Sequence, residues 1–436
     1  MKIPVIAIFD VGKTNKKLFL FNERYELVLE RSQQFAEIVD EDGFACENLS
    51  ALTLWVFSVF SEVSSLRDYE VKALNFSGYG ASLVHLDKAG KPVTPLYNYL
   101  KPYPKVLQKQ FYGEYGGEAL ISKLTASPVL GSLNSGMQIY RLKYEQPKLF
   151  LKIKRSLHLP QYLSFLFSHQ PVSDMTSIGC HTNLWDFEKN TYHEWVLTEK
   201  IVEKLAPIKP SSAVFRGNLL PAPIIGVGLH DSSAALIPYL ACFQEPFVLI
   251  STGTWCISMN PFNKAPLTLE ELGQDCLCYL TYEAQPVKAS RLFAGHQHEE
   301  GIKDLAKQFD KPIDYYKTVS FNVEIINELI RAFDLWHYKD YETAYHALMM
   351  DIVRQQVRST ELVIHNIGIK RIFVDGGFSS NPIYMRLLAL AFPEMKVYAA
   401  SVAQATALGA GLAIHSEWND NDIPNDLIDL KNYSIE

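Results

Sequence analysis

The sequence predicts an α/β protein built from two related domains, and three observations support this prediction. Short apolar runs that are typical of buried strands alternate with segments that are typical of helices. An apolar strand followed by a turn rich in glycine and hydroxyl residues occurs twice, at residues 5–14 and 247–255. The chain has 436 residues, enough for two or three domains of about 150 residues each.

Composition excludes several classes of protein. The 41 basic and 48 acidic side chains give a net charge of −7, so we expect no nucleic-acid partner. No window holds 18 uninterrupted apolar residues, so we expect no membrane span. The apolar run at residues 3–9 stops at Asp10 with no cleavage site after it, and this favours a first strand over a signal peptide. Six cysteines are too few for a disulfide scaffold, and Cys276 and Cys278 are expected to be buried thiols in a cytoplasmic protein.

The first half of the chain is expected to contain strands, one long helix and a largely helical region. Residues 5–9 are apolar throughout, as in a strand that is buried on both faces. We expect strands at 5–9, 17–21, 25–29 and 71–76, a helix at 49–66, and mostly helix from 105 to 170. Four prolines with two serines between them make residues 207–223 the best candidate for a linker.

After residue 223 the pattern begins again. We expect strands at 223–229, 247–250, 256–259, 371–377 and 396–399, and helices at 232–240, 381–392 and 403–414. In both halves a glycine stands two residues past the end of a strand, with small hydroxyl residues beside it and another strand after it. This similarity suggests two related α/β domains that face each other.

The turn after the first strand, residues 10–15, suits phosphate binding. Gly12 allows the backbone to approach a bound group, and successive N–H groups in such a turn form an anion-binding nest. Lys13, Thr14 and Asn15 add donors, and Asp10 is suited to hold Mg²⁺ through the water shell of the ion. A hairpin with a polar turn explains the same residues equally well.

A second turn of this kind follows the strand at residues 247–250. Ser251, Thr252, Gly253 and Thr254 are small and rich in hydroxyl and N–H groups, which suits a second phosphate contact. An ordinary glycine–threonine turn is the alternative. Two such turns in one chain, each after a buried strand, favour the phosphate interpretation.

His230 and Asp231 stand between a predicted strand and a predicted helix. Asp231 is suited either to cap the helix or to act as a general base toward a substrate hydroxyl, and the two roles are compatible. Because a helix N-terminus stabilises a carboxylate, we expect the pKa of Asp231 to be lowered and the side chain to be ionised at neutral pH.

Three further motifs are weaker. Gly376 and Gly377, after Asp375, would let a flat group such as a nucleoside lie against the backbone, although neither Rossmann nor P-loop spacing is present. Residues 296–300, His-Gln-His-Glu-Glu, are interpreted as plain surface rather than as a metal site. Asp174 would suit a hydrogen bond to a sugar, or a simple turn.

In order along the chain, these motifs resemble those of the FGGY family of carbohydrate kinases, and most closely its rhamnulokinase and deoxyketose kinase members. The matching segments are residues 10–15, 228–235, 251–255, 374–381 and 405–411. The resemblance implies two ribonuclease-H-like, actin-like ATPase domains flanking a deep cleft. It further implies a mainly sugar-binding domain at residues 1–238 and a mainly ATP-binding domain at residues 239–436.

The resemblance also implies roles for individual residues. Asp231 would be the catalytic base, and Asp10 would be linked to Mg²⁺ through water. The ATP contacts would be Gly12, Lys13, Thr14, Asn15, Lys17, Ser251, Thr252, Gly253, Thr254, Gly376, Gly377 and Asn381. Gly80 and His230 would lie at the sugar.

The chain departs from the family pattern at several positions. Ser82 stands where the family has an aspartate, Tyr99 ends a segment where the family has Arg-Asp, Lys13 replaces a small residue and Gln404 replaces a glutamate. Sugar-binding carboxylates are therefore missing. The candidate replacements are Ser82 itself, His85, Asn98, Asn134, Gln161 and Asp174.

The resulting hypothesis is an ATP-dependent kinase that phosphorylates a hydroxyl of a ketose or deoxyketose similar to L-rhamnulose, L-fuculose or xylulose. The alternative is a catalytically impaired sugar or nucleotide sensor on the same fold, motivated by the missing carboxylates. An actin- or chaperone-like ATPase would need a client-binding domain, which the sequence does not show. The expected ligands are the sugar, ATP and Mg²⁺, and a homodimer is left open.

Overall fold

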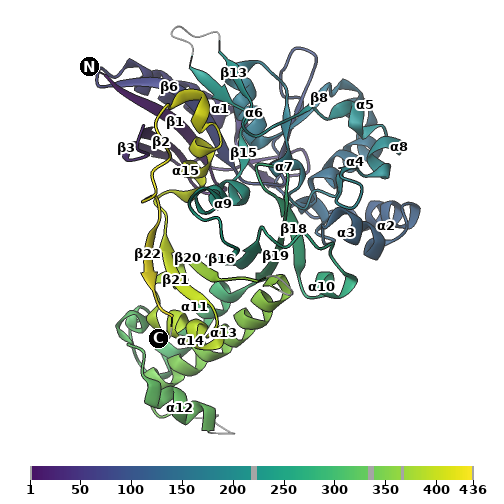
Figure 1. The fold of residues 1–436 in the computed structure, drawn as a ribbon. Helices are drawn as coiled ribbons and strands as arrows, with labels where there is room; N and C mark the ends of the chain where they lie inside the picture. The colour runs from purple at the N-terminus through teal and green to yellow at the C-terminus, as the bar shows by residue number, and fades with distance from the viewer. Residues whose placement is uncertain (1, 218–222, 332–337, 365–367, 435–436) are drawn as a thin grey trace.

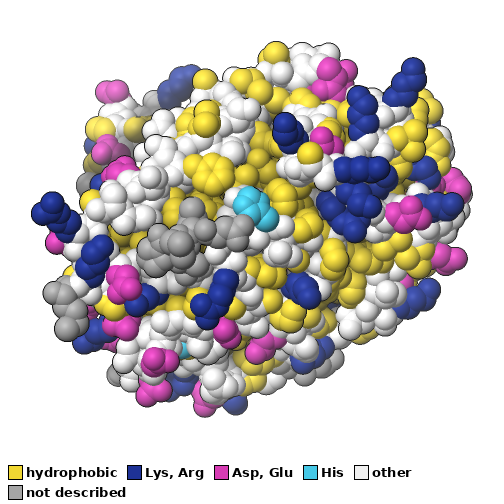
Figure 2. Space-filling model, turned by 90° about the horizontal axis from the view of Figure 1, so that it is seen from above, with side chains coloured by type: hydrophobic (Ala, Val, Ile, Leu, Met, Phe, Trp, Pro, Cys, Tyr) yellow, Lys and Arg dark blue, Asp and Glu magenta, His cyan; other side chains and the backbone are white. Residues whose placement is uncertain are grey.

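The computed structural model describes residues 2–217, 223–331, 338–364 and 368–434. It contains two seven-stranded sheets, and helices α9 (Asp231–Cys242) and α15 (Ala405–Leu412) lie between them (Figure 1). None of the helices in the described ranges has the length and apolar character that a bilayer crossing requires. Figure 2 shows mixed hydrophobic and charged side chains on the face seen from above, with lysine and arginine spread around it and one group of them to the right of the centre.

The first sheet has the strand order β13-β14-β6-β1-β2-β3, with β15 also paired to β6. Strand β1 pairs antiparallel with β2 and parallel with β6. Phe9, Phe76 and Phe167 pack together where α1 and α6 cover this sheet. The bounds are β1 Ile3–Val11, β2 Lys16–Asn22, β3 Leu27–Gln33, β6 Tyr69–Gly78, β13 Val214–Arg216, β14 Ile224–Gly226, β15 Leu229–His230, α1 Leu49–Ser65 and α6 Leu159–Ser168.

The second sheet has the order β18-β19-β17-β16-β20-β21-β22. Strand β16 pairs antiparallel with β17 and parallel with β20. Helices α11, α13 and α14 pack on this sheet through a separate apolar core. The bounds are β16 Phe247–Thr252, β17 Cys256–Asn260, β18 Cys276–Leu280, β19 Pro286–Leu292, β20 Arg371–Gly376, β21 Lys396–Ser401, β22 Asp429–Asn432, α11 Ala294–Gln308, α13 Tyr341–Ile364 and α14 Pro382–Ala391.

The two sheets repeat one arrangement, which confirms the predicted fold of two related α/β domains. In each, the strand that leads into a candidate phosphate turn has a hairpin partner on one side and a parallel strand on the other. The turns follow β1 and β16 in the two sheets, and the parallel neighbours are β6 and β20. The carboxyl ends of parallel strands share one edge of a sheet, which is where sheets of this kind place their sites.

Helices α9 and α15 join the two domains through a shared apolar core. This core contains Ile8 of the first sheet and Phe373 of the second, as well as residues of both helices. The helices approach so closely at Gly409 that a Cβ there would lie 1.8 Å from the carbonyl oxygen of Ala234. The Asn75 side chain also donates a 2.7 Å hydrogen bond to the carbonyl oxygen of Ala410. A segment near the C-terminus therefore completes the first domain.

A helical region is inserted in the first domain, as predicted for residues 105–170. It has its own core around Phe111, Tyr140 and Trp195. A strand interrupts it, because β8 pairs with β7. The bounds are β7 Leu83–Leu86, β8 Arg155–His158, β9 Ser173–Asp174, β10 Trp185–Asp186, β11 Thr191–Tyr192, α2 Lys105–Glu114, α3 Glu118–Thr125, α4 Ser135–Glu145, α5 Pro147–Lys152, α7 Met175–Ile178 and α8 Glu194–Thr198. The remaining short elements are β4 Ile38–Val39, β5 Ala45–Cys46, β12 Ile208–Lys209, α10 Leu269–Gly273, α12 Val323–Arg331 and α16 His415–Trp418.

The structure corrects three expectations about local elements. Strand β3 begins at Leu27 because Tyr25 adopts a φ of 60° in the turn and hydrogen-bonds His415. The strand expected at 223–229 is divided by Gly228, where a Cβ would lie 2.5 Å from the carbonyl oxygen of Pro160. Residues 207–223 are not a linker, because β12 pairs with β9 and β13 pairs with β14 inside the first domain. Residues 218–222 of that segment lie outside the described residues.

Candidate active site

Two carboxylates meet at one edge of the first sheet. Asp10 on β1 and Leu229 on β15 both stand opposite Ser77 of β6, and Asp231 follows directly at the start of α9. The pairing explains why residues 221 positions apart become neighbours: three parallel strands end at the same level. Burial raises the pKa of Asp10, and the nearby charge of Asp231 adds to this rise.

Asp231 lies deep in the protein, yet 31 % of its side chain remains exposed. Burial raises its pKa to about 6, although the backbone N–H of Ser232 donates a 2.6 Å hydrogen bond that opposes the rise. The sequence-based expectation of a lowered pKa was therefore wrong, because desolvation outweighs the helix N-terminus. The carboxylate is still mostly ionised at pH 7, since that pH lies above the raised value.

Asp10 carries a second buried charge. Burial raises its pKa to about 6, and a hydrogen bond from Thr406 and the charge of Lys17 oppose the rise. Oxygen ligands are what Mg²⁺ prefers, so the pair formed by Asp10 and Asp231 fits an ion that is held partly through water. Within the described ranges, no group of three or more histidine, cysteine, aspartate or glutamate side chains could hold a metal by itself.

His230 lies beside Asp231, and Gly80 lies beside His230. The Nε2 atom of His230 lies 3.1 Å from both Asp231 Oδ1 and Cys180 Sγ. Burial lowers the pKa of His230 to about 4, so this imidazole is neutral. A Cβ at position 80 would stand 3.0 Å from His230 Nε2 and 3.1 Å from Cys180 Sγ, so glycine keeps this corner open.

The other predicted sugar-binding side chains are buried or hold protein partners. Asp174 accepts hydrogen bonds from the backbone of Thr176 and Ser177 and from the Ser211 hydroxyl, and so caps α7. Asn134 bonds three backbone groups. Asn98 borders a separate small cavity together with Lys101. Among the predicted sugar-binding residues, those with at most 1 % exposure are Ser82, His85, Asn134, Gln161 and Asp174.

Sequence reasoning missed Arg291, Cys180 and Tyr279. The Arg291 guanidinium lies 5.3 Å from the Trp255 ring and 2.5 Å from Asp275 Oδ1, and its buried Nε has no partner among the described residues. Burial raises the pKa of Cys180 and of Tyr279, and at both residues Asp231 adds to the rise while Arg291 opposes it. Both side chains therefore lie near Asp231 and Arg291. A lone arginine in a strand has no sequence signature that would have revealed it.

The first candidate phosphate turn is closed by a 2.9 Å hydrogen bond from the Gly12 N–H to the Asn15 carbonyl oxygen. Its side chains have partners in the first domain. Lys13 pairs with Glu37 at 2.7 Å, Lys17 pairs with Glu30 at 3.0 Å, and the Asn15 side chain accepts a 2.7 Å hydrogen bond from Gln34. Both ion pairs are partly exposed, so little energy holds the lysines away from an incoming phosphate.

The second turn is built by close backbone packing. The Gly253 N–H donates to the Trp255 carbonyl oxygen at 2.9 Å, and a Cβ at Gly295 would lie 1.9 Å from the Gly253 carbonyl oxygen. The Thr252 hydroxyl donates to the Asp375 carbonyl oxygen and accepts from the Phe378 N–H. Ser251 and Thr252 stand opposite Asp375 and Gly376 in the parallel pair, which brings the two predicted motifs together.

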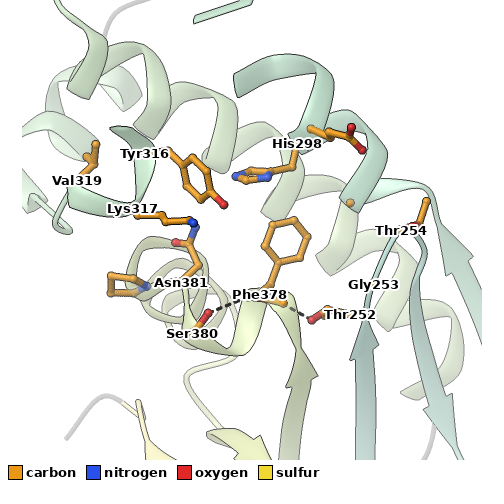
Figure 3. A pocket seen from close by; sticks show the side chains of 14 residues that line it. Thr252, Gly253, Thr254, His298, Tyr316, Lys317, Val319, Phe378, Ser380 and Asn381 are labelled. Carbon is orange, nitrogen blue, oxygen red and sulfur yellow. Dashed lines mark hydrogen bonds between the residues drawn. The ribbon is translucent and has the colours of Figure 1, made fainter. Parts of the chain in front are cut away.

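A cavity of about 550 Å³ opens beside this second turn (Figure 3). Its wall contains five of the predicted ATP contacts, namely Thr252, Gly253, Thr254, Gly377 and Asn381. Gly376 borders the same strand end with a φ of 85°, and a Cβ there would lie 2.0 Å from the Thr252 carbonyl oxygen. The predicted motifs of the second domain therefore converge on one cavity.

The same cavity has lining residues that were not predicted as contacts, among them His298, Tyr316 and Lys317. The interpretation of residues 296–300 as plain surface was wrong for His298, because α11 turns this ring into the cavity while Glu299 and Glu300 pair with Lys303. Cys276 and Cys278 are buried free thiols, as predicted.

Comparisons with known proteins agree with this architecture. Residues 5–237 match the N-terminal domain of the FGGY family of carbohydrate kinases, and residues 244–326 match the carbohydrate kinase FGGY C-terminal domain. A rhamnulokinase of Oceanobacillus iheyensis is 22% identical over 267 residues, which cover 57% of this chain and 54% of that protein. The chain thus matches about half the length of this curated relative.

Two solved structures share the whole fold. A carbohydrate kinase from Novosphingobium aromaticivorans superposes with a TM-score of 0.83 at 21% identity, covering 100% of this chain and 95% of that one. A ligand-bound xylulose kinase from Lactobacillus acidophilus gives a TM-score of 0.81 at 16% identity, covering 100% and 94%.

Proposed function

The chain belongs to the FGGY family of carbohydrate kinases, and on this basis we propose that it transfers the γ-phosphoryl group of ATP to a hydroxyl of a ketose or deoxyketose. One observation carries the proposal: Asp231 and Asp10 stand together at one sheet edge, and Asp231 keeps a partly exposed carboxylate with no strong ion pair. A purely structural carboxylate at this depth would be expected to have a cationic partner.

In the proposed reaction, Asp231 accepts the proton of the acceptor hydroxyl. The hydroxyl oxygen then forms a bond to the γ-phosphorus, and the bond from that phosphorus to the bridging oxygen breaks, so that ADP leaves with the bridging electron pair. General-base assistance of this kind contributes about 10²- to 10⁴-fold in rate. Positioning and charge neutralisation supply the rest.

ATP is proposed to place its base in the second-domain cavity and its phosphates between the turns at residues 12–15 and 251–254. Asp10 would hold Mg²⁺ through its water shell, and the ion when bound would neutralise phosphate charge. Residues 1–238 would mainly bind the sugar, and residues 239–436 would mainly bind ATP.

The acceptor is proposed to lie against Gly80, His230, Tyr279 and Arg291, next to Asp231. Neutral imidazole and phenol groups suit sugar hydroxyls, because they donate and accept hydrogen bonds without a net charge. The rhamnulokinase relatives support a deoxyketose acceptor such as L-rhamnulose. L-Fuculose and xylulose are proposed as further candidate acceptors.

The test is ATP-dependent ADP release over a panel of ketoses, deoxyketoses and polyols, with Asp231→Asn as the matched variant. We expect at least one ketose to be turned over by the wild type at a rate that the variant lowers by at least about 100-fold. If no compound gives turnover above the variant, the kinase proposal is wrong. Calorimetric sugar binding without turnover would indicate a sensor instead.

A further inference from the structure

Three side chains from three separate elements form a hydrogen-bonded chain at the wall of the 550 Å³ cavity. The chain begins at Asn381, which caps α14. Its Oδ1 accepts the backbone N–H groups of Ile383 at 3.0 Å and Tyr384 at 3.1 Å. Because two donors occupy the oxygen, the other end of the amide is the NH₂ group, and this group donates to the Tyr345 hydroxyl at 2.7 Å.

The Tyr345 hydroxyl must therefore donate its own hydrogen bond to an acceptor other than Asn381. The ring is fully buried, and burial raises the pKa of its hydroxyl, so the phenol is neutral. A buried hydroxyl proton needs an acceptor, and Asn381 is already a donor. Within the described part of the chain, the remaining hydrogen-bond partner of this hydroxyl is His298 Nε2 at 3.0 Å.

The protonation of His298 follows from this arrangement. Burial lowers its pKa to about 4, so the ring is neutral and carries one N–H. Since Nε2 accepts the tyrosine proton, the hydrogen is on Nδ1. No described residue forms a hydrogen bond with Nδ1. The ring itself lines the cavity (Figure 3). It makes edge-to-face contacts with the rings of Tyr316 and Phe378, at centroid distances of 5.0 Å and 5.3 Å.

Building on the proposed kinase function, we propose that His298 is a specificity-determining residue whose Nδ1–H donates to a ring nitrogen of the purine base of ATP. Asn381 and Tyr345 are positioning residues that fix the His298 tautomer. The unprotonated ring nitrogens of adenine can only accept, so a donor held in one orientation matches them. The aromatic rings of Tyr316 and Phe378 supply the surface against which a flat base packs.

Deaza analogues of ATP test this proposal, because each replaces one accepting nitrogen with a C–H group. Binding of ATP and of 1-deaza-, 3-deaza- and 7-deaza-ATP to the wild type and to His298→Phe is measured by calorimetry. We expect one analogue to bind the wild type about five- to tenfold more weakly than ATP, and this difference to vanish in His298→Phe. The proposal is overturned if every analogue binds the wild type as ATP does, or if the difference persists in the variant.

Tyr345→Phe provides a second, milder variant that keeps the ring and removes only the hydroxyl. Nitrogen NMR of the wild type should show His298 protonated at Nδ1, and in Tyr345→Phe the two tautomers should mix. A wild-type signal from the Nε2-protonated form overturns the assignment even if His298→Phe does not fold.

These measurements do not depend on turnover. The analogue pattern without phosphorylation of any sugar would reject the proposed function and support this inference. Sugar phosphorylation with no difference among the analogues would support the proposed function and reject this inference.

Discussion

The hydroxyl of Thr406 donates a 2.7 Å hydrogen bond to Asp10 Oδ2, which joins residues 396 positions apart. Thr406 stands at the start of α15, and Asp10 near the end of β1. The bond opposes the rise in the Asp10 pKa that burial produces. A helix near the C-terminus thus helps to keep a first-domain carboxylate ionised.

Removing this hydroxyl should weaken metal-dependent activity. In Thr406→Val the pKa of Asp10 should rise further, so a larger fraction is protonated at pH 7. We expect the Mg²⁺ concentration for half-maximal activity to increase about three- to tenfold at pH 7, and by less at pH 8.5. Magnesium titrations at both pH values measure this. Thr53→Val, which loses a 3.1 Å bond to Tyr162, is the control and should leave the requirement unchanged.

Activity should depend on the ionisation of Asp231. Burial raises its pKa to about 6, and a general base must be deprotonated to act. We therefore expect kcat/KM to fall about tenfold per pH unit below 6 and to level off above about 7. A profile from pH 5 to 8.5 measures this, and a flat profile between pH 5 and 7 would contradict the assigned role.

Asp231→Asn should make the protein more stable at neutral pH. The folded-state pKa lies above the unfolded value, so the cost of burying the charge grows as the pH rises from about 4 to 6 and is fully present above about 6. We expect the free energy of unfolding to rise by about 1–3 kcal/mol at pH 7, and the gain to shrink as the pH falls from about 6 to 4. Denaturant unfolding at pH 7 and 4.5 tests this, with exposed Asp304→Asn as the neutral control. An unchanged or lower stability of the variant at pH 7 would show that burial of the ionised Asp231 side chain does not cost stability.

Gly409→Ala should separate the helices that join the two domains. The added Cβ would meet the Ala234 carbonyl oxygen at 1.8 Å, so the two helix backbones would have to move apart. We expect a loss of about 1–3 kcal/mol in unfolding free energy, measured with denaturant. Gly113→Ala, on an exposed helix face with open space around it, should instead be neutral or stabilising by up to about 1 kcal/mol. Equal effects at the two positions would rule out the packing explanation.

Arg291→Lys should weaken sugar binding more than ATP binding. Lysine keeps the charge but lacks the planar guanidinium group that lies over Trp255 and donates an N–H to Asp275. We expect the KM for the sugar to rise about tenfold while the KM for ATP changes less than about twofold. Exposed Arg354→Lys on α13 is the control. A rise confined to the KM for ATP would place Arg291 at the phosphates rather than at the sugar.

Several parts of the site could be predicted because their chemistry is local in the chain. Asp10 and the start of the turn at residues 251–254 lie at the ends of strands, and Asp231 directly follows one, so strand patterning alone places them at a sheet edge. Other lining residues of the second-domain cavity could not be found in this way. His298 and Tyr316 come from different elements, and packing decides whether such side chains face a cavity or solvent.

By itself, the sequence determined the two-domain α/β fold, the strands that lead into the candidate phosphate turns, the positions of the glycine turns and the two candidate carboxylates. These features depend on residues that are close together in the chain, where apolar spacing and turn chemistry act directly. Only the tertiary structure decided the direction of the Asp231 pKa shift, the contact of Arg291 with Trp255 and the hydrogen bond from Thr406 to Asp10. Desolvation and side-chain direction arise from neighbours that are distant in sequence, and folding alone brings those neighbours together.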